Sequence, residues 1–204
     1  MQIYVDESCL SIKLPNKKYR DVKAHMLFIS KYCNFKCIFC KFNEGYIDDS
    51  ENNYYSKKFK NYTDEEMTNL IKKLMKKNKC FKFSGGEPLM NKKLEFMLEI
   101  TKNSGGITFL DTNCSLYSVL TKLIDKNLID ILGVSLKGVT PDQAKFNTQV
   151  MNTDLVWNNV FNSIEYALKN SVKYVIITLV VFDFTKKNDL LLFLQRYTDL
   201  FKKV

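Results

Sequence analysis

Proline and glycine are scarce in this 204-residue sequence, which contains three prolines and seven glycines. Both counts lie below the usual shares of about 5% and 7%, which excludes collagen-like and low-complexity chains. The longest apolar run, around residues 175–182, falls well short of the ~20 residues that a membrane-spanning helix needs. The first residues have neither the basic nor the apolar region of a secretory signal. We therefore expect a cytoplasmic protein with no membrane partner.

Histidine is limited to His25, which we expect to be a structural residue, whereas there are six cysteines, at positions 9, 33, 37, 40, 80 and 114. Three of the cysteines fall within eight residues of one another. In a reducing cytoplasm, such a cluster favours metal binding or catalysis over disulfide formation. The other three are far apart in the sequence, and we expect them to be buried free thiols. Cys114 is the exception among them, because it lies on the predicted active face, at the end of a strand.

The composition is otherwise that of an ordinary globular domain, with 46% hydrophobic and 26% charged residues. The net charge of +9 is concentrated in residues 57–93, where eleven lysines stand against four acidic residues. A basic surface attracts nucleic acid or an acidic protein. No RNA-binding aromatic motif, zinc finger or arginine cluster accompanies these lysines, so we expect no nucleic-acid partner.

Apolar periodicity predicts five strand–helix units after a short N-terminal hairpin. The strands are predicted at 25–30, 80–84, 107–111, 129–136 and 172–182, and the helices at 63–75, 91–103, 115–127, 154–170 and after 185. This order predicts an α/β fold with a mostly parallel sheet, as a partial (βα) barrel or an open doubly wound sheet. In both folds, the chemistry lies at the carboxyl ends of the strands.

We expect residues 1–204 to form a single domain. Residues 1–23 are predicted to be the hairpin extension, with strands at Ile3–Val5 and Cys9–Leu14. Residues 42–62 are polar and rich in Asn and Tyr, which predicts a long loop or lid. Thr63 and Glu66 have the spacing of a capping box, which predicts that a helix begins there.

Cys33, Cys37 and Cys40 form the motif C-x3-C-x2-C directly after the first strand of the predicted parallel sheet. A structural zinc site needs four ligands, and ferredoxin-type clusters use four cysteines at a different spacing. Three cysteines on a 4Fe–4S cluster would leave one iron open, which is typical of a catalytic centre. An iron–sulfur or zinc binding module without enzymatic activity is the alternative.

This cysteine motif, with the aromatic Phe39 before its last cysteine and with Gly-Gly-Glu-Pro at 85–88, resembles the radical S-adenosylmethionine (SAM) superfamily. The resemblance spans roughly residues 24–182 and implies a partial (βα) barrel of about five to six parallel strands, the radical SAM core. It implies that the three cysteines hold a 4Fe–4S cluster whose open iron binds SAM, and that Phe39 packs near the adenine.

The same resemblance assigns roles to the glycine-rich turn. Gly85, Gly86 and Glu87 would bind the SAM amino group, with Glu87 supplying negative charge near a cation. Glycines also allow the backbone to approach a ligand closely. A plain strand-to-helix turn is the alternative for this segment taken alone.

Two further segments resemble the activating enzymes of glycyl-radical enzymes, such as those for pyruvate formate-lyase and anaerobic ribonucleotide reductase. Asp111-Thr112-Asn113 resembles their D-T-N-G segment, and Ser135-Leu136-Lys137 resembles their D-x-K segment. The resemblance implies that Asp111, Asn113, Ser135 and Lys137 contact SAM. The sequence departs from the pattern at Cys114, which replaces Gly, and at Ser135, which replaces Asp.

The resemblance implies an enzyme that reductively cleaves SAM to methionine and a 5′-deoxyadenosyl radical, which abstracts a hydrogen atom from a substrate. One expectation is activation of a glycyl-radical enzyme, and the alternative is modification of a peptide or small molecule. An electron donor such as flavodoxin or ferredoxin would dock on the lysine-rich 57–93 segment, in an anaerobic or well-reduced cytoplasm. The length is short for the family, so we expect a barrel open on one side that admits a peptide or protein segment.

Overall fold

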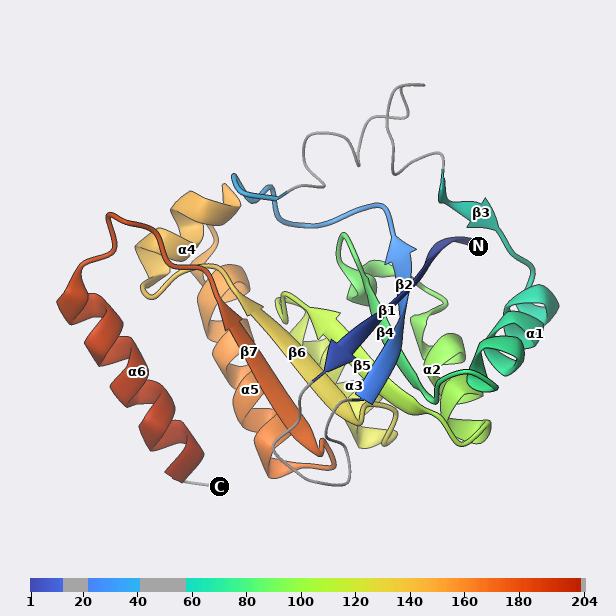
Figure 1. The fold of residues 1–204 in the computed structure, drawn as a ribbon. Helices are drawn as coiled ribbons and strands as arrows, with labels where there is room; N and C mark the ends of the chain where they lie inside the picture. The colour runs from blue at the N-terminus through green and yellow to red at the C-terminus, as the bar shows by residue number, and fades with distance from the viewer. Residues whose placement is uncertain (13–21, 41–57, 203–204) are drawn as a thin grey trace.

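The computed structural model describes residues 1–12, 22–40 and 58–202 (Figure 1). Its sheet has the strand order β3-β1-β2-β4-β5-β6-β7. Strands β2, β4, β5, β6 and β7 run parallel to one another, while β1 is antiparallel to both β2 and β3. The strands are β1 (Gln2–Ile12), β2 (Val22–Ser30), β3 (Lys60–Asn61), β4 (Cys80–Gly85), β5 (Ile107–Thr112), β6 (Ile131–Leu136) and β7 (Tyr174–Leu179).

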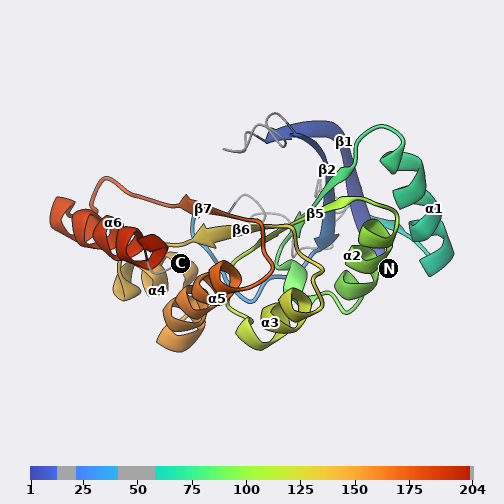
Figure 2. The same cartoon turned by 90° about the horizontal axis from the view of Figure 1, so that it is seen from below.

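Helices follow each parallel strand and lie along the outer face of the curved sheet (Figure 2). This arrangement confirms the predicted α/β fold with a partial barrel of parallel strands. Within the described ranges, no helix is both long enough and apolar enough to cross a bilayer. The helical segments are α1 (Asp64–Met75), the 3-10 turn η3 (Pro88–Met90), α2 (Leu94–Asn103), α3 (Tyr117–Asp125), α4 (Pro141–Thr148), the π-helical turn η4 (Asp154–Asn158), α5 (Asn159–Lys169) and α6 (Lys187–Lys202).

Helix α1 begins at the predicted capping box. The Thr63 amide donates to Glu66 Oε2 at 2.7 Å, and the Glu66 amide donates to Thr63 Oγ1 at 3.2 Å. These two bonds satisfy amide groups that have no partner within the helix. Met67 and Ile71 on the apolar face are fully buried against the sheet. The lysines of α1 therefore face solvent.

The N-terminal region differs from the predicted hairpin. β1 is one strand rather than two, because a register shift between Asp6 and Cys9 lets it continue along β2. Such a bulge accommodates extra residues without ending the pairing. The short β3 pairs with the other edge of β1. Residues 13–21 of the expected hairpin, and residues 42–57 of the expected lid, lie outside the described residues.

Alternation along the strands separates two environments. On β4, Phe81 and Phe83 pack towards the helices in the main core, while Lys82 and Ser84 face the concave side. A smaller apolar cluster that includes Cys80, Phe109 and Ile131 fills the concave side near the start of the strands. Polar side chains on the concave side are therefore confined to positions nearer the carboxyl ends of the strands.

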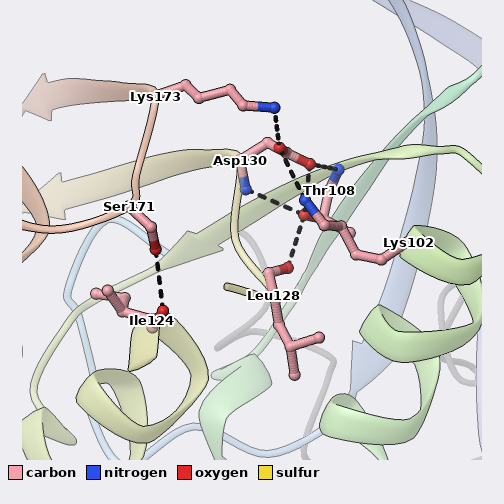
Figure 3. A network of polar contacts seen from close by, with 7 residues as sticks. All are labelled: Lys102, Thr108, Ile124, Leu128, Asp130, Ser171 and Lys173. Carbon is pink, nitrogen blue, oxygen red and sulfur yellow. Dashed lines mark hydrogen bonds and ion pairs between the residues drawn. The ribbon is translucent and has the colours of Figure 1, made fainter. Parts of the chain in front are cut away.

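Asp130 joins three strands at the opposite, amino-terminal end of the sheet (Figure 3). Its side chain is 3% exposed and accepts hydrogen bonds from the Thr108 amide at 3.0 Å, from Lys102 Nζ at 3.0 Å and from Lys173 Nζ at 2.6 Å. Burial by itself would raise the pKa of Asp130, but the bonds from Lys173, Thr108 and Lys102 outweigh it and lower the pKa. At this end of such a fold, a polar network serves stability.

We predict that Asp130→Asn lowers the free energy of unfolding at pH 7 by about 3 kcal/mol, because it breaks a buried ion pair. Since the folded pKa is lowered, this contribution is present above the unfolded pKa of ~3.9 and is lost as the pH falls through the folded pKa. Urea unfolding from pH 7 down to pH ~3 should therefore show the difference from wild type shrinking below pH ~4.

The exposed pair between Glu165 and Lys169 provides the control, with both side chains about half exposed. Glu165→Gln should cost less than about 0.5 kcal/mol at pH 7. An Asp130→Asn cost as small as this control would contradict the role assigned to Asp130.

Candidate active site

A cavity of about 190 Å³ opens at the carboxyl ends of the parallel strands. Its walls come from the loop after β2 and from the ends of β4, β5 and β6. Ten of the eleven site residues expected from the sequence line it: Cys33, Cys37, Phe39, Cys40, Gly85, Gly86, Asp111, Asn113, Ser135 and Lys137. The tertiary structure thus gathers residues from Cys33 to Lys137, which are more than a hundred positions apart in the sequence.

The cysteine loop is held from outside by the end of α4. The Lys36 amide donates to Thr148 O, and the Ile38 amide donates to Asn147 O, both at 2.9 Å. Sequence analysis did not predict α4, although Thr140 and Pro141 carry the signal for its start: Thr140 Oγ1 accepts from the Gln143 amide. The backbone shape of the thiol loop therefore depends on this helix.

Cys37 is buried, while Cys33 and Cys40 are half-buried in the cavity wall. Burial raises the pKa of Cys33 to about 11 and also raises the pKa of Cys37, while the nearby Lys137 lowers both to a smaller extent. Neutral thiols in this environment lose their protons when they bind a metal, because the metal stabilises the thiolate.

The donor set fits an iron–sulfur cluster. Among the residues that the structure describes, no three side chains of His, Cys, Asp or Glu converge on a point where one metal ion could be held. A 4Fe–4S cluster does not require convergence on one point, because each thiolate binds a different iron. Three soft thiols on one loop beside a cavity match the ligands that such clusters select.

The glycine-rich turn lies directly against the cysteine loop. The Gly86 amide donates to Ser30 O at 2.8 Å, and the Glu87 amide donates to Tyr32 O at 2.7 Å. A Cβ on Gly86 would lie 2.2 Å from Tyr32 O, and one on Gly85, whose φ is +133°, would lie 2.6 Å from Ser30 O. The glycines are therefore required for this close approach between two backbones, and they also form part of the cavity wall.

Glu87 differs from the expectation that it supplies charge beside a ligand. Its side chain is 1% exposed, and the residue does not line the cavity. Oε1 accepts from Thr112 Oγ1 at 2.6 Å and from the Leu89 amide at 3.0 Å, while Oε2 accepts from the Asn113 amide at 2.9 Å. Burial raises the pKa of Glu87 to about 7, against these hydrogen bonds, which lower it. The carboxyl group thus ties the end of β4 to the end of β5.

Asp111 points to the concave side, where Lys82 Nζ lies 2.8 Å from its Oδ2. Ser84 Oγ donates to the same oxygen at 3.4 Å. Gly133 on the neighbouring strand makes room, because a Cβ there would lie 2.9 Å from Asp111 Oδ1. Sequence analysis missed Lys82, although strand alternation from Ser84 places it on the same face.

Ser135 and Lys137 form the far wall of the cavity. Lys137 Nζ donates to Ser135 Oγ and lies 5.5 Å from the centre of the Phe39 ring. The Phe39 ring is also 5.9 Å from the ring of Phe182. A cation and an aromatic ring thus lie together beside the last cysteine of the loop.

Cys114 faces away from the cavity. It is fully buried in the main core, and its carbonyl accepts from Ser163 Oγ on α5 at 3.0 Å. Its φ of 58° lies in the left-handed region, which is uncommon for a residue with a Cβ. Cys80 is buried in the smaller cluster. Both cysteines match the expectation of buried free thiols, and the side chain of Cys9 lies outside the described residues.

Comparison with protein families finds that the model of the radical SAM superfamily matches residues 27–196. Among curated proteins, the GTP 3′,8-cyclase of Clostridium botulinum (strain Okra / Type B1) is 26% identical over 170 residues, covering 81% of this chain and 50% of the relative. The probable GTP 3′,8-cyclase of Methanocaldococcus jannaschii is 28% identical over 158 residues, covering 76% and 50%. Molybdenum cofactor biosynthesis protein 1 of Dictyostelium discoideum is 31% identical over 148 residues, covering 69% and 21%.

The chain spans about half the length of the GTP 3′,8-cyclases that it matches. Among solved structures, TYW1 with a lysine-pyruvate adduct bound superposes with a TM-score of 0.56 at 18% identity, covering 90% of this chain and 64% of that one. Archaeal TYW1 superposes with a TM-score of 0.50 at 18% identity, covering 87% and 61%. At these identities, the structural similarity shows a shared fold.

We predict that Gly86→Ala prevents the loops from closing on each other, because its Cβ would meet the Tyr32 backbone. The free energy of unfolding should fall by about 3 kcal/mol. The iron content after anaerobic reconstitution should fall well below that of wild type. Thermal unfolding and iron and sulfide analysis measure the two effects.

Gly105→Ala is the matched control, because Gly105 has a φ of +78° and open space around its Cα. This substitution should lower the free energy of unfolding by about 1 kcal/mol through backbone strain and should leave the iron content unchanged. Normal iron content in Gly86→Ala would show that the contact is not needed to shape the site.

Proposed function

This chain belongs to the radical SAM superfamily, whose members use a 4Fe–4S cluster and SAM, and we propose that it is a radical SAM enzyme that modifies a small molecule. In this proposal, Cys33, Cys37 and Cys40 hold the cluster. The observation that carries it is the single cavity in which these thiols meet the Gly85-Gly86 turn and the polar ends of β5 and β6. These residues meet at the carboxyl edge of a parallel sheet, and such folds carry their chemistry at that edge.

When bound, the cluster and SAM would supply the one-electron and radical chemistry, which is the reductive cleavage of SAM and the abstraction of hydrogen from a substrate. The residues of the chain would bind and orient these cofactors. The Gly85-Gly86 backbone and Asp111 would hold the amino acid part of SAM, and Lys137 and Ser135 its polar groups. Phe39 would pack against the adenine and keep water from the thiols.

In this proposal, Asn113 and Glu87 act without direct contact to SAM. The polar atoms of the Glu87 side chain are used by protein partners, which leaves its carboxyl group a role in joining two loops. Asn113 lines the cavity, but its amide is bonded to the cysteine loop. Both residues therefore shape the site.

The relatives support a small-molecule substrate over a glycyl-radical enzyme. The curated relatives reported above include proteins named GTP 3′,8-cyclase, which act on a nucleotide by name. The case for an activating enzyme rests on Asp111-Thr112-Asn113, and the sequence departs from that pattern at Cys114 and Ser135. Purine nucleotides are therefore the first candidates to test as substrates.

We predict that anaerobically reconstituted protein, given dithionite and SAM, forms 5′-deoxyadenosine. Single Ala substitutions of Cys33, Cys37 and Cys40 should each abolish the product, because each removes a cluster ligand. Cys80→Ala should retain it, since Cys80 lies in the apolar cluster on the concave side. Chromatography of the nucleoside products measures the outcome, and a wild-type protein that holds a cluster but forms no 5′-deoxyadenosine would contradict the enzyme proposal.

The same assay addresses the substrate class. A small molecule that is the substrate, with GTP tested first, should raise the yield of 5′-deoxyadenosine and pass its abstracted hydrogen to it. A glycyl-radical signal on a partner protein, with no response to small molecules, would favour the activating-enzyme alternative instead.

The lysine-rich segment 57–93, which is the expected docking site of an electron donor, contributes to two separate basic surfaces. The lysines at the end of α1 lie beside the first half of β2, because His25 Nε2 is bonded to Leu74 O at 2.9 Å. From His25 to Ser30, β2 extends by about 3.3 Å per residue, or ~17 Å. The α1 lysines therefore lie at the end of the sheet opposite the cysteine loop.

A second basic surface lies next to the cysteine loop. A hollow of about 340 Å³ is lined by Lys31, Lys92 and Lys93, with the exposed apolar side chains of Tyr32 and Met90. Tyr32 directly precedes the first cysteine of the motif. An apolar centre with a basic rim suits an acidic carrier protein, because charge steers the encounter and apolar contact completes it. We propose that flavodoxin or ferredoxin docks on this surface.

We predict that the double variant Lys31→Glu, Lys92→Glu lowers activity with a flavodoxin at low salt by about tenfold or more, while activity with dithionite stays unchanged. The matched variant Lys72→Glu, Lys73→Glu on α1 should leave both activities near wild type. Rates of 5′-deoxyadenosine formation with each reductant decide the matter. A loss confined to the α1 variant would place the dock on α1 instead.

A further inference from the structure

Asn113 lies in the cavity wall next to the cysteine loop. The residue is 5% exposed, and its amide nitrogen Nδ2 lies 3.8 Å from Cys33 Sγ and donates to Asn34 Oδ1 at 3.0 Å. On its other side, Oδ1 accepts from the Ser115 amide at 2.9 Å. The side chain thus bridges the end of β5 and the loop that carries the thiols.

The surrounding bonds set the orientation of this amide. The Ser115 backbone N–H can only donate, so it requires the oxygen of Asn113 on its side and turns Nδ2 towards Cys33. Asn34 Nδ2 donates in turn to Ser115 Oγ at 2.8 Å, which closes a ring of three residues that includes the Ser115 backbone amide. The backbone amide of Asn113 donates to Oε2 of the buried Glu87 carboxyl at 2.9 Å, which fixes the main chain of Asn113.

We infer that Asn113 is a positioning residue that donates an N–H···S hydrogen bond to the Cys33 thiolate and so raises the reduction potential of the cluster bound there. The inference rests on the proposed cluster. Reduction adds one electron, taken from the external reductant, and places more negative charge on the sulfurs. A hydrogen-bond donor at a sulfur stabilises the form with more negative charge and makes reduction easier.

This role differs from the SAM contact that the resemblance implies for Asn113. Its amide group already bonds Asn34 and Ser115 and faces the Cys33 sulfur. The amide therefore acts on the cysteine loop from the adjoining wall of the cavity. Its effect on the reaction would pass through Cys33.

The test is a potentiometric titration of the reconstituted cluster, followed by electron paramagnetic resonance, in wild type and in Asn113→Ser. Serine can still accept from the Ser115 amide in a local turn, but its side chain is too short to reach Cys33. We expect the equilibrium for reduction to become about tenfold less favourable, which for one electron is a shift of about 59 mV to lower potential.

Asn159→Ala is the matched control. It removes the bond from Asn159 Nδ2 to Ser115 O, which has a length of 2.8 Å and lies in the same network but away from the sulfur. We expect it to keep the wild-type potential. An unchanged potential in Asn113→Ser, or an equal shift in Asn159→Ala, would overturn the inference.

If Asn113→Ser assembles no cluster, Asn113→Asp takes its place, because it keeps the shape and the Oδ1 acceptor but loses the donor. It should also shift the potential downwards, and an unchanged potential would overturn the inference. Wild-type protein with ¹⁵N in its asparagine side chains should show a ¹⁵N coupling in pulsed spectra of the reduced cluster, and absence of that coupling would overturn it whatever the variants do. Iron and sulfide content in wild type separately tests the proposed cluster.

Discussion

The close contact between the glycine-rich turn and the loop after β2 is the constraint on which the site depends. Gly86 approaches the Tyr32 backbone so closely that even a methyl group would not fit. The amides of Gly86 and Glu87 bond Ser30 O and Tyr32 O across this contact. Cys33, the first cysteine of the motif, directly follows Tyr32. The position of the thiols therefore depends on the contact between Gly86 and the Tyr32 backbone just before them.

Buried polar groups extend this constraint from one strand to the next. Glu87 would be costly to bury without partners, and its oxygens accept three hydrogen bonds from Thr112, Leu89 and Asn113. A matching arrangement exists at the other end of the sheet, where Asp130 joins β5, β6 and β7. One network supports the candidate site at the carboxyl edge, and the other supports the barrel beneath it.

Much of the fold and part of the site are local in origin and could be predicted. The capping box of Thr63 and Glu66 predicts where α1 begins, and apolar periodicity predicts the five strand–helix units. β1 and α4 were not predicted in their observed form. The continuity of β1 depends on pairing with β2 across a bulge, and the apolar face of α4 is too weak to stand out, since its buried residues are Ala144, Asn147 and Thr148.

By itself, the sequence determined which residues are candidates for the site, because the C-x3-C-x2-C and Gly-Gly-Glu-Pro motifs are local patterns. Only the tertiary structure decided which way those residues face. The Glu87 carboxyl turns inwards because Thr112 and Asn113 offer it donors there, and Asn113 turns its amide to Cys33 because Ser115 holds its oxygen. These orientations depend on contacts between strands that are distant in the chain, and no local pattern encodes them.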